Sequence, residues 1–215
     1  AATIRTLVDA GLIEVTEENV YRKPVLKSAL SGKDGTAKQL SAEQQAVVDA
    51  ISQDYSLGIS QTYLLRGITG SGKTEVYMAL IERMIASGKQ AIVLIPEIAL
   101  TYQTLLRFYL RFGDRVSVMN SRLSPGERSD QYERAAKGEI DIMIGPRSAL
   151  FTPFERLGLV IIDEEHESSY KSETMPKFHA REVAQELCRM KHASLLLGSA
   201  TPSLESYYRA RQGEV

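Results

Sequence analysis

Two short stretches of the chain combine residue types and spacings that could perform chemistry. The first is GITGSGKTE at residues 67–75, and the second is DEEH at residues 163–166. Glycines in the first stretch allow the backbone to bend around a phosphate with its amide hydrogens pointing inward. Three carboxylates and an imidazole in the second suit a metal ion and an attacking water. The sequence therefore predicts a phosphate-binding loop and a metal-binding segment.

The phosphate-binding loop has the form G-x-x-x-x-G-K-T between a predicted strand and a predicted helix, which is the context that this motif requires. The ammonium group of Lys73 would neutralise the β- and γ-phosphates of ATP, and the hydroxyl of Thr74 would bind Mg²⁺. The start of the helix adds a partial positive charge. A chance glycine-rich turn is the alternative, and the complete motif disfavours it. The predicted nucleotide-binding residues of the loop are Gly67, Thr69, Gly70, Ser71, Gly72, Lys73 and Thr74.

The acidic segment follows the apolar run LGLVIID, which is typical of a strand buried on both faces. Asp163 at the strand end would hold Mg²⁺, which prefers few protein carboxylates together with phosphate oxygens and waters. Glu164 would act as the general base on the attacking water. A solvated acidic loop is the alternative, and the position downstream of a phosphate-binding loop disfavours it. His166 would either link the nucleotide to a second ligand or cap the next turn.

Strands and helices alternate from residue 40 onwards, which indicates an α/β fold with a doubly wound, mostly parallel sheet. Ligands bind such sheets at the carboxyl ends of the strands, where both motifs lie. The predicted strands are residues 62–67, 91–96, 115–120, 140–145, 157–163 and 193–199. The predicted helices begin after a Ser41 cap, cover residues 76–85, 98–112 and 127–137, and end with residues 178–190.

The first 39 residues differ in pattern from the rest. Residues 4–20 read as a helix end, a turn at Gly11 and a short strand, which matches either the last helix and wing of a winged-helix fold or an ordinary helix–turn–strand. Residues 27–39 are rich in Ser, Gly, Lys and Ala without periodicity, as in a linker. We therefore predict a winged-helix remnant at 1–26, a linker at 27–39 and one nucleotide-binding lobe at 40–215.

Composition limits the class of protein. The chain has 215 residues, 43% of them hydrophobic, and a formal charge of −1, so any surface for nucleic acid has to be local. Cys188 is the single cysteine, which excludes an internal disulfide and fits a reducing cytoplasm; we expect it in the core. No apolar run approaches the ~20 residues of a membrane helix, so we expect no membrane partner.

Further blocks of sequence match one known family. They are LIPEIALTYQ (94–103), IGPRSALFTPF (144–154), LGLVIIDEEHESSYK (157–171), FHAREVA (178–184) and LGSATPSLES (197–206). With these blocks the chain resembles the superfamily 2 helicases and, within them, the replication-restart helicases of the primosomal protein N′ family. The resemblance covers residues 40–215 and implies a P-loop NTPase with the fold of a RecA-like first motor lobe.

The resemblance also implies a function. It suggests the ATP-binding lobe of an ATP-dependent 3′ to 5′ DNA helicase that acts in replication restart and primosome assembly at stalled forks in a bacterial cytoplasm. The implied cofactors are ATP and Mg²⁺, and the implied partners are single-stranded and forked DNA, primosome proteins and single-strand-binding proteins, with a monomeric chain. A small-molecule kinase and a nucleotide-switched binding module are the alternatives. A strand ending in DEEH and followed by GSAT disfavours the kinase, and Glu164 disfavours a pure switch.

Individual residues acquire roles from the same resemblance. Gln44 would read adenine, and Ser199 and Thr201 would couple hydrolysis to DNA movement. The blocks PEIALTYQ, with Thr101, and GPRSALF, with Arg147, would border the path of single-stranded DNA. Residues 167–179 would form an aromatic-rich loop that senses DNA. The predicted DNA-contacting or coupling residues are Thr101, Arg147, His166, Tyr170, Lys171, Ser199 and Thr201.

Several interpretations stay open at this point. The SETMPKF run at 172–178 has fewer aromatics than the family pattern, so Tyr170 and Phe178 would either stack on bases, worth about 1–3 kcal/mol per base, or pack against the sheet edge. Arg107 and Arg111 share a helical face and would either contact phosphates or form a solvated face. We also expect the chain to be a segment of a longer protein, without the second motor lobe, zinc-binding segment and fork-binding domain. The chain alone should then bind Mg-nucleotide weakly and hydrolyse it slowly or not at all.

Overall fold

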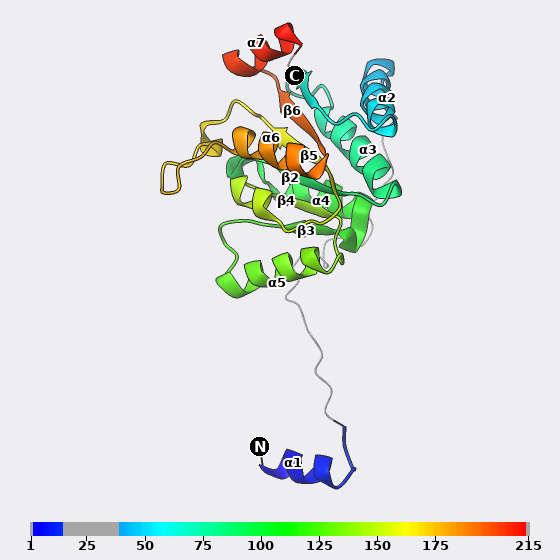
Figure 1. Cartoon of the computed structure of the whole chain (residues 1–215), viewed down its shortest axis with the longest axis vertical. Helices are drawn as coiled ribbons and strands as arrows, with labels where there is room; N and C mark the ends of the chain where they lie inside the picture. The colour runs from blue at the N-terminus through cyan, green and yellow to red at the C-terminus, as the bar shows by residue number, and fades with distance from the viewer. Residues whose placement is uncertain (1, 15–38, 214–215) are drawn as a thin grey trace.

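A computed structural model describes residues 2–14 and 39–213 of the chain. Its centre is one sheet of six parallel strands in the order β1-β6-β5-β2-β4-β3 (Figure 1). This arrangement confirms the doubly wound parallel sheet that the alternating pattern predicts. The strands are β1 (Thr62–Arg66), β2 (Gln90–Leu94), β3 (Val116–Val118), β4 (Ile142–Gly145), β5 (Leu157–Asp163) and β6 (Ser194–Ser199).

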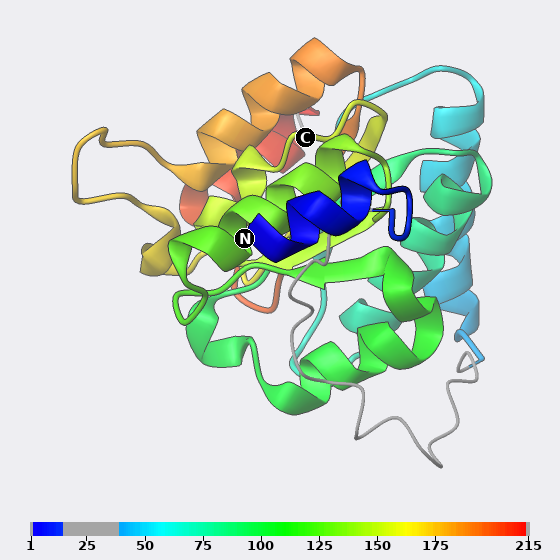
Figure 2. The ribbon, with the colours of Figure 1, turned by 90° about the horizontal axis from the view of Figure 1, so that it is seen from below.

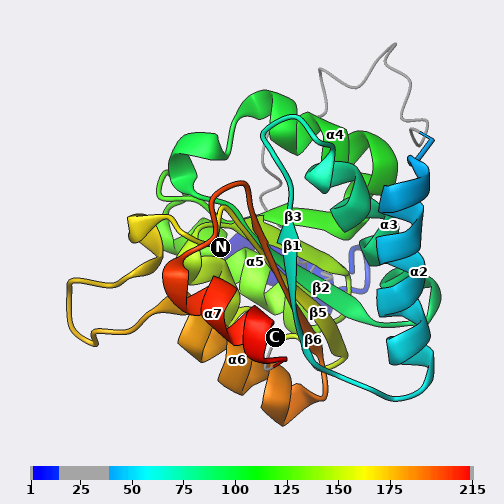
Figure 3. The same ribbon diagram turned by 90° about the horizontal axis from the view of Figure 1, so that it is seen from above.

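Helices cover both faces of the sheet, and each face has its own hydrophobic core. On one face, α2 (Ala42–Ser56), α3 (Lys73–Ala86) and α4 (Tyr102–Phe112) pack over the sheet. On the other face lie α5 (Pro125–Ala136) and α6 (Ala180–Lys191) (Figure 3). In β5, alternate residues enter opposite cores, which is why that strand is apolar throughout. The two packed layers hold the carboxyl ends of β1, β5 and β6 side by side.

Capping residues set where several helices begin. Ser41 and Ser124 each form a capping box, with Gln44 and with Glu127, at the starts of α2 and α5. The helix that we expected from residue 98 begins later, at Tyr102. Thr101 is extended and caps α4, and the residues before it form a short 3₁₀ turn, η2 (Glu97–Ala99). Its predicted start is therefore wrong by one turn.

The last helix, α7 (Leu204–Gln212), was not among the predicted elements. Ser203 caps it, and it contacts β1 at the edge of the sheet. Most of its residues are polar or exposed, so it lacks the periodic apolar face by which the other helices were recognised. The available signal was Ser203 followed by Glu205, because serine is a preferred helix cap and acidic residues are enriched in the first turn.

The remaining elements are short 3₁₀ turns in the connections between strands and helices or, for η4, between β4 and β5. They are η3 (Gly113–Arg115), η4 (Arg147–Phe151) and η5 (Ser168–Tyr170). Between η5 and α6, residues 171–179 form a loop that projects from the body (Figures 2 and 3). The helix that we expected from residue 178 starts instead at Ala180, with His179 as its cap.

The N-terminal prediction is tested only in part. A helix, α1 (Ala2–Asp9), is followed by a turn at residues 10–11, as expected. Residues 12–14 are not in a strand. The rest of the predicted strand and nearly all of the predicted linker lie outside the described residues, so the winged-helix remnant stays a prediction. Across 2–14 and 39–213, no helix is both long enough and apolar enough to cross a membrane.

Candidate active site

The phosphate-binding loop joins β1 to α3 and bends back on itself. Gly70 and Gly72 both have φ of +82°, a left-handed conformation that side chains disfavour, so glycine is needed there. Lys73, the first residue of α3, donates a hydrogen bond from Nζ to the carbonyl oxygen of Gly67 at 2.9 Å. Its side chain is only 9% exposed. The lysine side chain therefore folds over the loop, and its ammonium group lies at the N-terminal end of α3.

A cavity of about 550 Å³ opens above this loop. The structure brings together there most of the residues that the sequence assigns to nucleotide binding and hydrolysis. The cavity is lined by Gln39, Gln44, Thr69, Gly70, Ser71, Gly72, Lys73, Thr74, Glu75, Arg107, Asp163 and Glu164. Residues from four separate parts of the chain thus surround a space of the size that small-molecule ligands occupy.

Asp163, the last residue of β5, is held by a tyrosine that the sequence reasoning did not single out. The hydroxyl of Tyr77 donates to Oδ1 of Asp163 at 2.8 Å. Burial raises the pKa of Asp163 above its usual range, and this hydrogen bond acts in the opposite direction. Burial also raises the pKa of Tyr77 well above its usual value, so the phenol stays protonated and remains a donor. The signal in the sequence was a polar-tipped aromatic one helical turn after Lys73.

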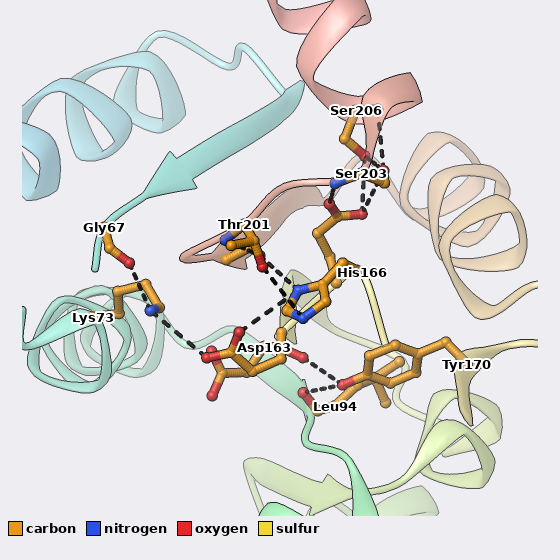
Figure 4. A network of polar contacts seen from close by, with 12 residues as sticks. Gly67, Lys73, Leu94, Asp163, His166, Tyr170, Thr201, Ser203 and Ser206 are labelled. Atoms are coloured by element: carbon orange, nitrogen blue, oxygen red, sulfur yellow. Dashed lines mark hydrogen bonds and ion pairs between the residues drawn. The ribbon is translucent and has the colours of Figure 1, made fainter. Parts of the chain in front are cut away.

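Glu164 has an unusual backbone and two charged neighbours. Its φ is +47°, a left-handed conformation that costs about 1–3 kcal/mol for a residue with a side chain and that is frequent at active sites. One carboxylate oxygen lies 3.7 Å from Lys73 Nζ, and the other lies 3.7 Å from His166 Nδ1 (Figure 4). This conformation directs the carboxylate toward the cavity, where a general base is required.

His166 connects the acidic segment to the end of β6. Its Nδ1 lies 2.8 Å from Ser199 Oγ, and its Nε2 lies 3.5 Å from Thr201 Oγ1. The amide of Thr201 donates to the same serine hydroxyl at 3.0 Å. The three predicted coupling residues therefore form one chain of contacts that begins beside Glu164 (Figure 4). This favours the linking role of His166 over the turn-capping role.

Tyr170 does not offer a stacking surface, and that part of the prediction is wrong. The residue is 1% exposed, and its hydroxyl lies 3.1 Å from the carbonyl oxygen of Leu94 and 2.7 Å from that of Asp163. Burial in the core between β2 and β5 is the physical reason. Phe178 stays partly accessible, and its ring meets that of Phe151 edge-on at 5.6 Å.

The donor set fits a magnesium ion bound together with a nucleotide. Thr74 and Asp163 both line the cavity and offer oxygen atoms, which Mg²⁺ prefers. Among the residues that the structure describes, no group of three or more His, Cys, Asp or Glu could hold a metal ion without other ligands. A site of this kind is completed by phosphate oxygens and waters rather than by a protein cage.

Comparison with known proteins decides which class of nucleotide-binding protein this is. The sequence model of the DEAD/DEAH box helicases matches residues 41–210. The chain belongs to the DEAD/DEAH box helicase family. The helicase reading of the sequence is thereby confirmed, and the kinase and switch alternatives are disfavoured.

Individual relatives show to which group of helicases the chain is similar. The helicase chain is 47% identical to replication restart protein PriA of Bacillus subtilis over 99% of its own length, which is 26% of that protein. It is 51% identical to PriA of Chlamydia trachomatis serovar D over 80% of its length, which is 23% of that protein. The chain thus spans about a quarter of the relatives that it matches, and the predicted similarity to replication-restart helicases is confirmed.

Solved structures agree on the fold. The helicase chain matches RecG, solved bound to a three-way DNA junction, with a TM-score of 0.62 and 25% identity, over 83% of this chain and 23% of that one. It matches the helicase domain of Hef from Pyrococcus furiosus with a TM-score of 0.56 and 17% identity, over 82% and 37%. The RecA-like helicase fold that the sequence predicts is confirmed.

Two polar residues of the helicase lobe that were assigned to ligands are engaged in the protein itself. The amide group of Gln44 accepts from Ser41 N at 2.9 Å and donates to Ser71 O at 2.8 Å, so it ties α2 to the phosphate-binding loop while lining the cavity. The hydroxyl of Thr101 accepts from Thr104 N at 3.2 Å as the cap of α4. Reading a base or touching DNA would require either side chain to exchange these contacts.

The two arginines of α4 that share a face both pair with carboxylates. Arg107 pairs with Glu75 at 2.5 Å and lines the nucleotide cavity. Arg111, with 10% of its side chain exposed, pairs with Glu82 at 2.5 Å and with Glu75 at 3.4 Å. Neither alternative from the sequence describes Arg111, because its ion pairs leave it neither solvated nor free for phosphate.

Arg147 and Lys171 meet at the base of the projecting loop. Arg147 donates to the carbonyl oxygens of Ser169 at 3.3 Å and of Lys171 at 2.6 Å, so it fixes the backbone around η5. Lys171 is exposed and forms an isolated antiparallel bridge with His179. The lysine ammonium is therefore carried on a braced backbone at the surface.

Proposed function

We propose that this chain is the ATP-binding lobe of an ATP-dependent 3′ to 5′ DNA helicase that acts in replication restart. One observation carries the proposal. Lys73 Nζ lies 3.7 Å from the carboxylate of Glu164 in the lining of the cavity, and the contacts of His166 extend from Glu164 to Thr201. A hydrolytic centre is thus joined to a second segment that could report the state of the nucleotide.

The chemistry follows from the residues around the cavity. The ammonium of Lys73 would attract the β- and γ-phosphates, and the left-handed glycines allow the loop backbone to curve around them. Thr74 and Asp163 would hold Mg²⁺, which supplies positive charge against the phosphate oxygens. The carboxylate of Glu164 would orient the attacking water and accept its proton.

Coupling to DNA would run along the contacts at the ends of the strands. Loss of the γ-phosphate changes the charge that Lys73 and Glu164 face. Glu164 is next to His166, so the change would reach Ser199 and Thr201. Arg147, Lys171 and the loop at 171–179 are braced at the same edge of the sheet. RecG, whose fold is similar, is solved bound to a three-way DNA junction.

Partners and setting follow from the relatives. Replication restart proteins cover about four times the length of this chain. We propose single-stranded and forked DNA as ligands, primosome and single-strand-binding proteins as partners, a bacterial cytoplasm as the setting and a monomeric state. We also propose that the chain alone hydrolyses ATP slowly or not at all, because an arginine finger from a second lobe contributes about 10³–10⁵ in rate in related nucleotide hydrolases.

Strand displacement by the complete protein that contains this chain tests the function. Forked DNA with a labelled strand should be unwound in the presence of Mg²⁺ and ATP when a 3′ single-stranded arm is available for loading, and not when only a 5′ arm is. Lys73→Ala should abolish unwinding. Unwinding that does not need ATP, or that proceeds equally in Lys73→Ala, would contradict the proposal.

A further inference from the structure

Glu165 is the third acid of DEEH and has no part in the chemistry described so far. Its side chain is fully buried, with an exposed fraction of 0%. A carboxylate is rarely buried unless it is paired and hydrogen-bonded, because it gives up strong hydration. The burial of Glu165, whose side chain points from the catalytic segment toward α7, therefore requires partners for its charge.

The carboxylate of Glu165 is satisfied on both oxygens. Oε1 accepts from the backbone amide of Ser203 at 2.6 Å. Oε2 accepts from the hydroxyl of Ser206 at 3.0 Å and of Ser203 at 3.2 Å, and from Arg181 at 3.3 Å. The same guanidinium nitrogen of Arg181 lies 2.9 Å from each serine hydroxyl. The cluster is a closed network with one carboxylate at its centre (Figure 4 shows Ser203 and Ser206).

This network ties three elements to the catalytic segment. Ser203 is the cap of α7, and Arg181 lies in the first turn of α6. The backbone amide of Glu165 donates to the carbonyl oxygen of Gly198 in β6 at 3.0 Å. His166, the next residue, holds Ser199 and Thr201. Two adjacent residues thus hold both ends of the segment at 199–206.

The hydrogen bonds of Glu165 also restrict the backbone of its neighbour Glu164. A residue with a side chain keeps a left-handed backbone only where its surroundings over-determine it. The carboxylate of Asp163 on one side is fixed by Tyr77, and Glu165 on the other side is fixed by Ser203 and Gly198. Glu164, with φ of +47°, lies between these two fixed residues, which hold its backbone in place.

We propose that Glu165, together with Arg181, is a positioning residue that holds Glu164 in its catalytic conformation and anchors the segment at 199–206. The segment can then respond to the nucleotide at the Thr201 end while its Ser203 end stays fixed. This inference rests on the proposed function. His166 is the responsive side, because 34% of its side chain is exposed and its contact to Thr201 is long.

The test uses ATP hydrolysis by the complete protein with and without forked DNA. Glu165→Gln keeps the volume but removes the charge that faces Arg181. The DNA-stimulated kcat should fall about ten-fold or more, because a small misplacement of a catalytic group has effects of this size. KM for ATP and the Kd of a fluorescent nucleotide analogue should not change. Glu205→Gln, on an exposed carboxylate of α7, is the matched control and should behave as the parent.

A second pair of variants keeps the test decisive if Glu165→Gln does not fold. Ser203 has φ of −58°, which proline adopts without strain. Ser203→Ala and Ser203→Pro both remove the hydroxyl, but only the proline removes the amide that binds Glu165. The proline variant should lose DNA-stimulated kcat, and hydrogen exchange at residues 204–206 should become faster than in the alanine variant.

The outcomes separate the inference from the proposed function. No stimulation of the parent protein by DNA would overturn both. If DNA stimulates the parent but kcat is unchanged in Glu165→Gln, or in Ser203→Pro relative to Ser203→Ala, the positioning role of Glu165 alone would be overturned. A loss of thermal stability with normal kcat at low temperature would show that the cluster is only structural, and would also overturn it.

Discussion

Replacing Gly198 by alanine should destabilise this lobe through Tyr77. Gly198 lies in β6, paired with Asp163 of β5, and a Cβ added there would lie 1.7 Å from the hydroxyl oxygen of Tyr77 and 2.9 Å from Cζ. Tyr77 is 1% exposed and has no room to retreat. Overpacking of this kind costs about 1–3 kcal/mol. Displacement of the hydroxyl also removes its bond to Asp163, worth about 1.5–3 kcal/mol for a charged acceptor.

The expected decrease in the free energy of unfolding is therefore about 3 kcal/mol or more for Gly198→Ala, and about 2 kcal/mol for Tyr77→Phe. The double variant should lose less than the sum, by about 2 kcal/mol or more, because phenylalanine lacks the hydroxyl that lies nearest to the new Cβ and the hydrogen bond is lost only once. Urea unfolding of this chain followed by circular dichroism measures all three, with the urea dependence checked for constancy.

Tyr109→Phe, on α4, is the control and is combined with Gly198→Ala in a second double variant. The decreases in the free energy of unfolding of these two substitutions should add. Additivity of Gly198→Ala and Tyr77→Phe to within about 0.5 kcal/mol would refute the reasoning, because residues without contact normally add to this precision.

Three further predictions test the site and its surroundings. Burial raises the folded pKa of Asp163 above its usual 3.8, so its ionisation lowers stability as pH rises through that raised pKa. Asp163→Asn should therefore gain stability relative to the parent from pH 4 to pH 7 in urea titrations, and a constant difference would contradict this. Burial raises the pKa of Cys188 to about 12, so Ellman's reagent at pH 8 should label the thiol only after unfolding, and rapid native labelling would argue against burial. Arg111→Ala should destabilise more than Arg107→Ala, because Arg111 is the more buried arginine and pairs with two carboxylates; equal losses in thermal unfolding would oppose this ranking.

The sequence predicts those features that depend on local pattern. The apolar run of β5 indicates a strand buried on both faces, and the structure places it between two cores. The phosphate-binding loop is recognised because its glycines, lysine and threonine lie within eight residues of one another. The sheet topology then brings Asp163 beside the loop, since both follow parallel strands that end at one edge.

Other features depend on partners far away in the sequence. Tyr77 and Gly198 fit together only in the folded sheet, and neither has a local signal of that fit. Tyr170 is an aromatic residue in a polar loop, and only its contacts with Leu94 and Asp163 show that it is buried. Glu165 reads as one of three similar acids, because burial and the cap of α7 distinguish it only in three dimensions.

DNA-stimulated ATP hydrolysis by the complete protein tests the central claim most directly. The rate should rise strongly when a fork with a single-stranded arm is added, and Glu164→Gln should reduce the stimulated rate by about 10²-fold or more while nucleotide still binds. A rate that does not respond to DNA, or a stimulated rate that survives Glu164→Gln, would contradict the account of this cavity as the motor of a DNA helicase.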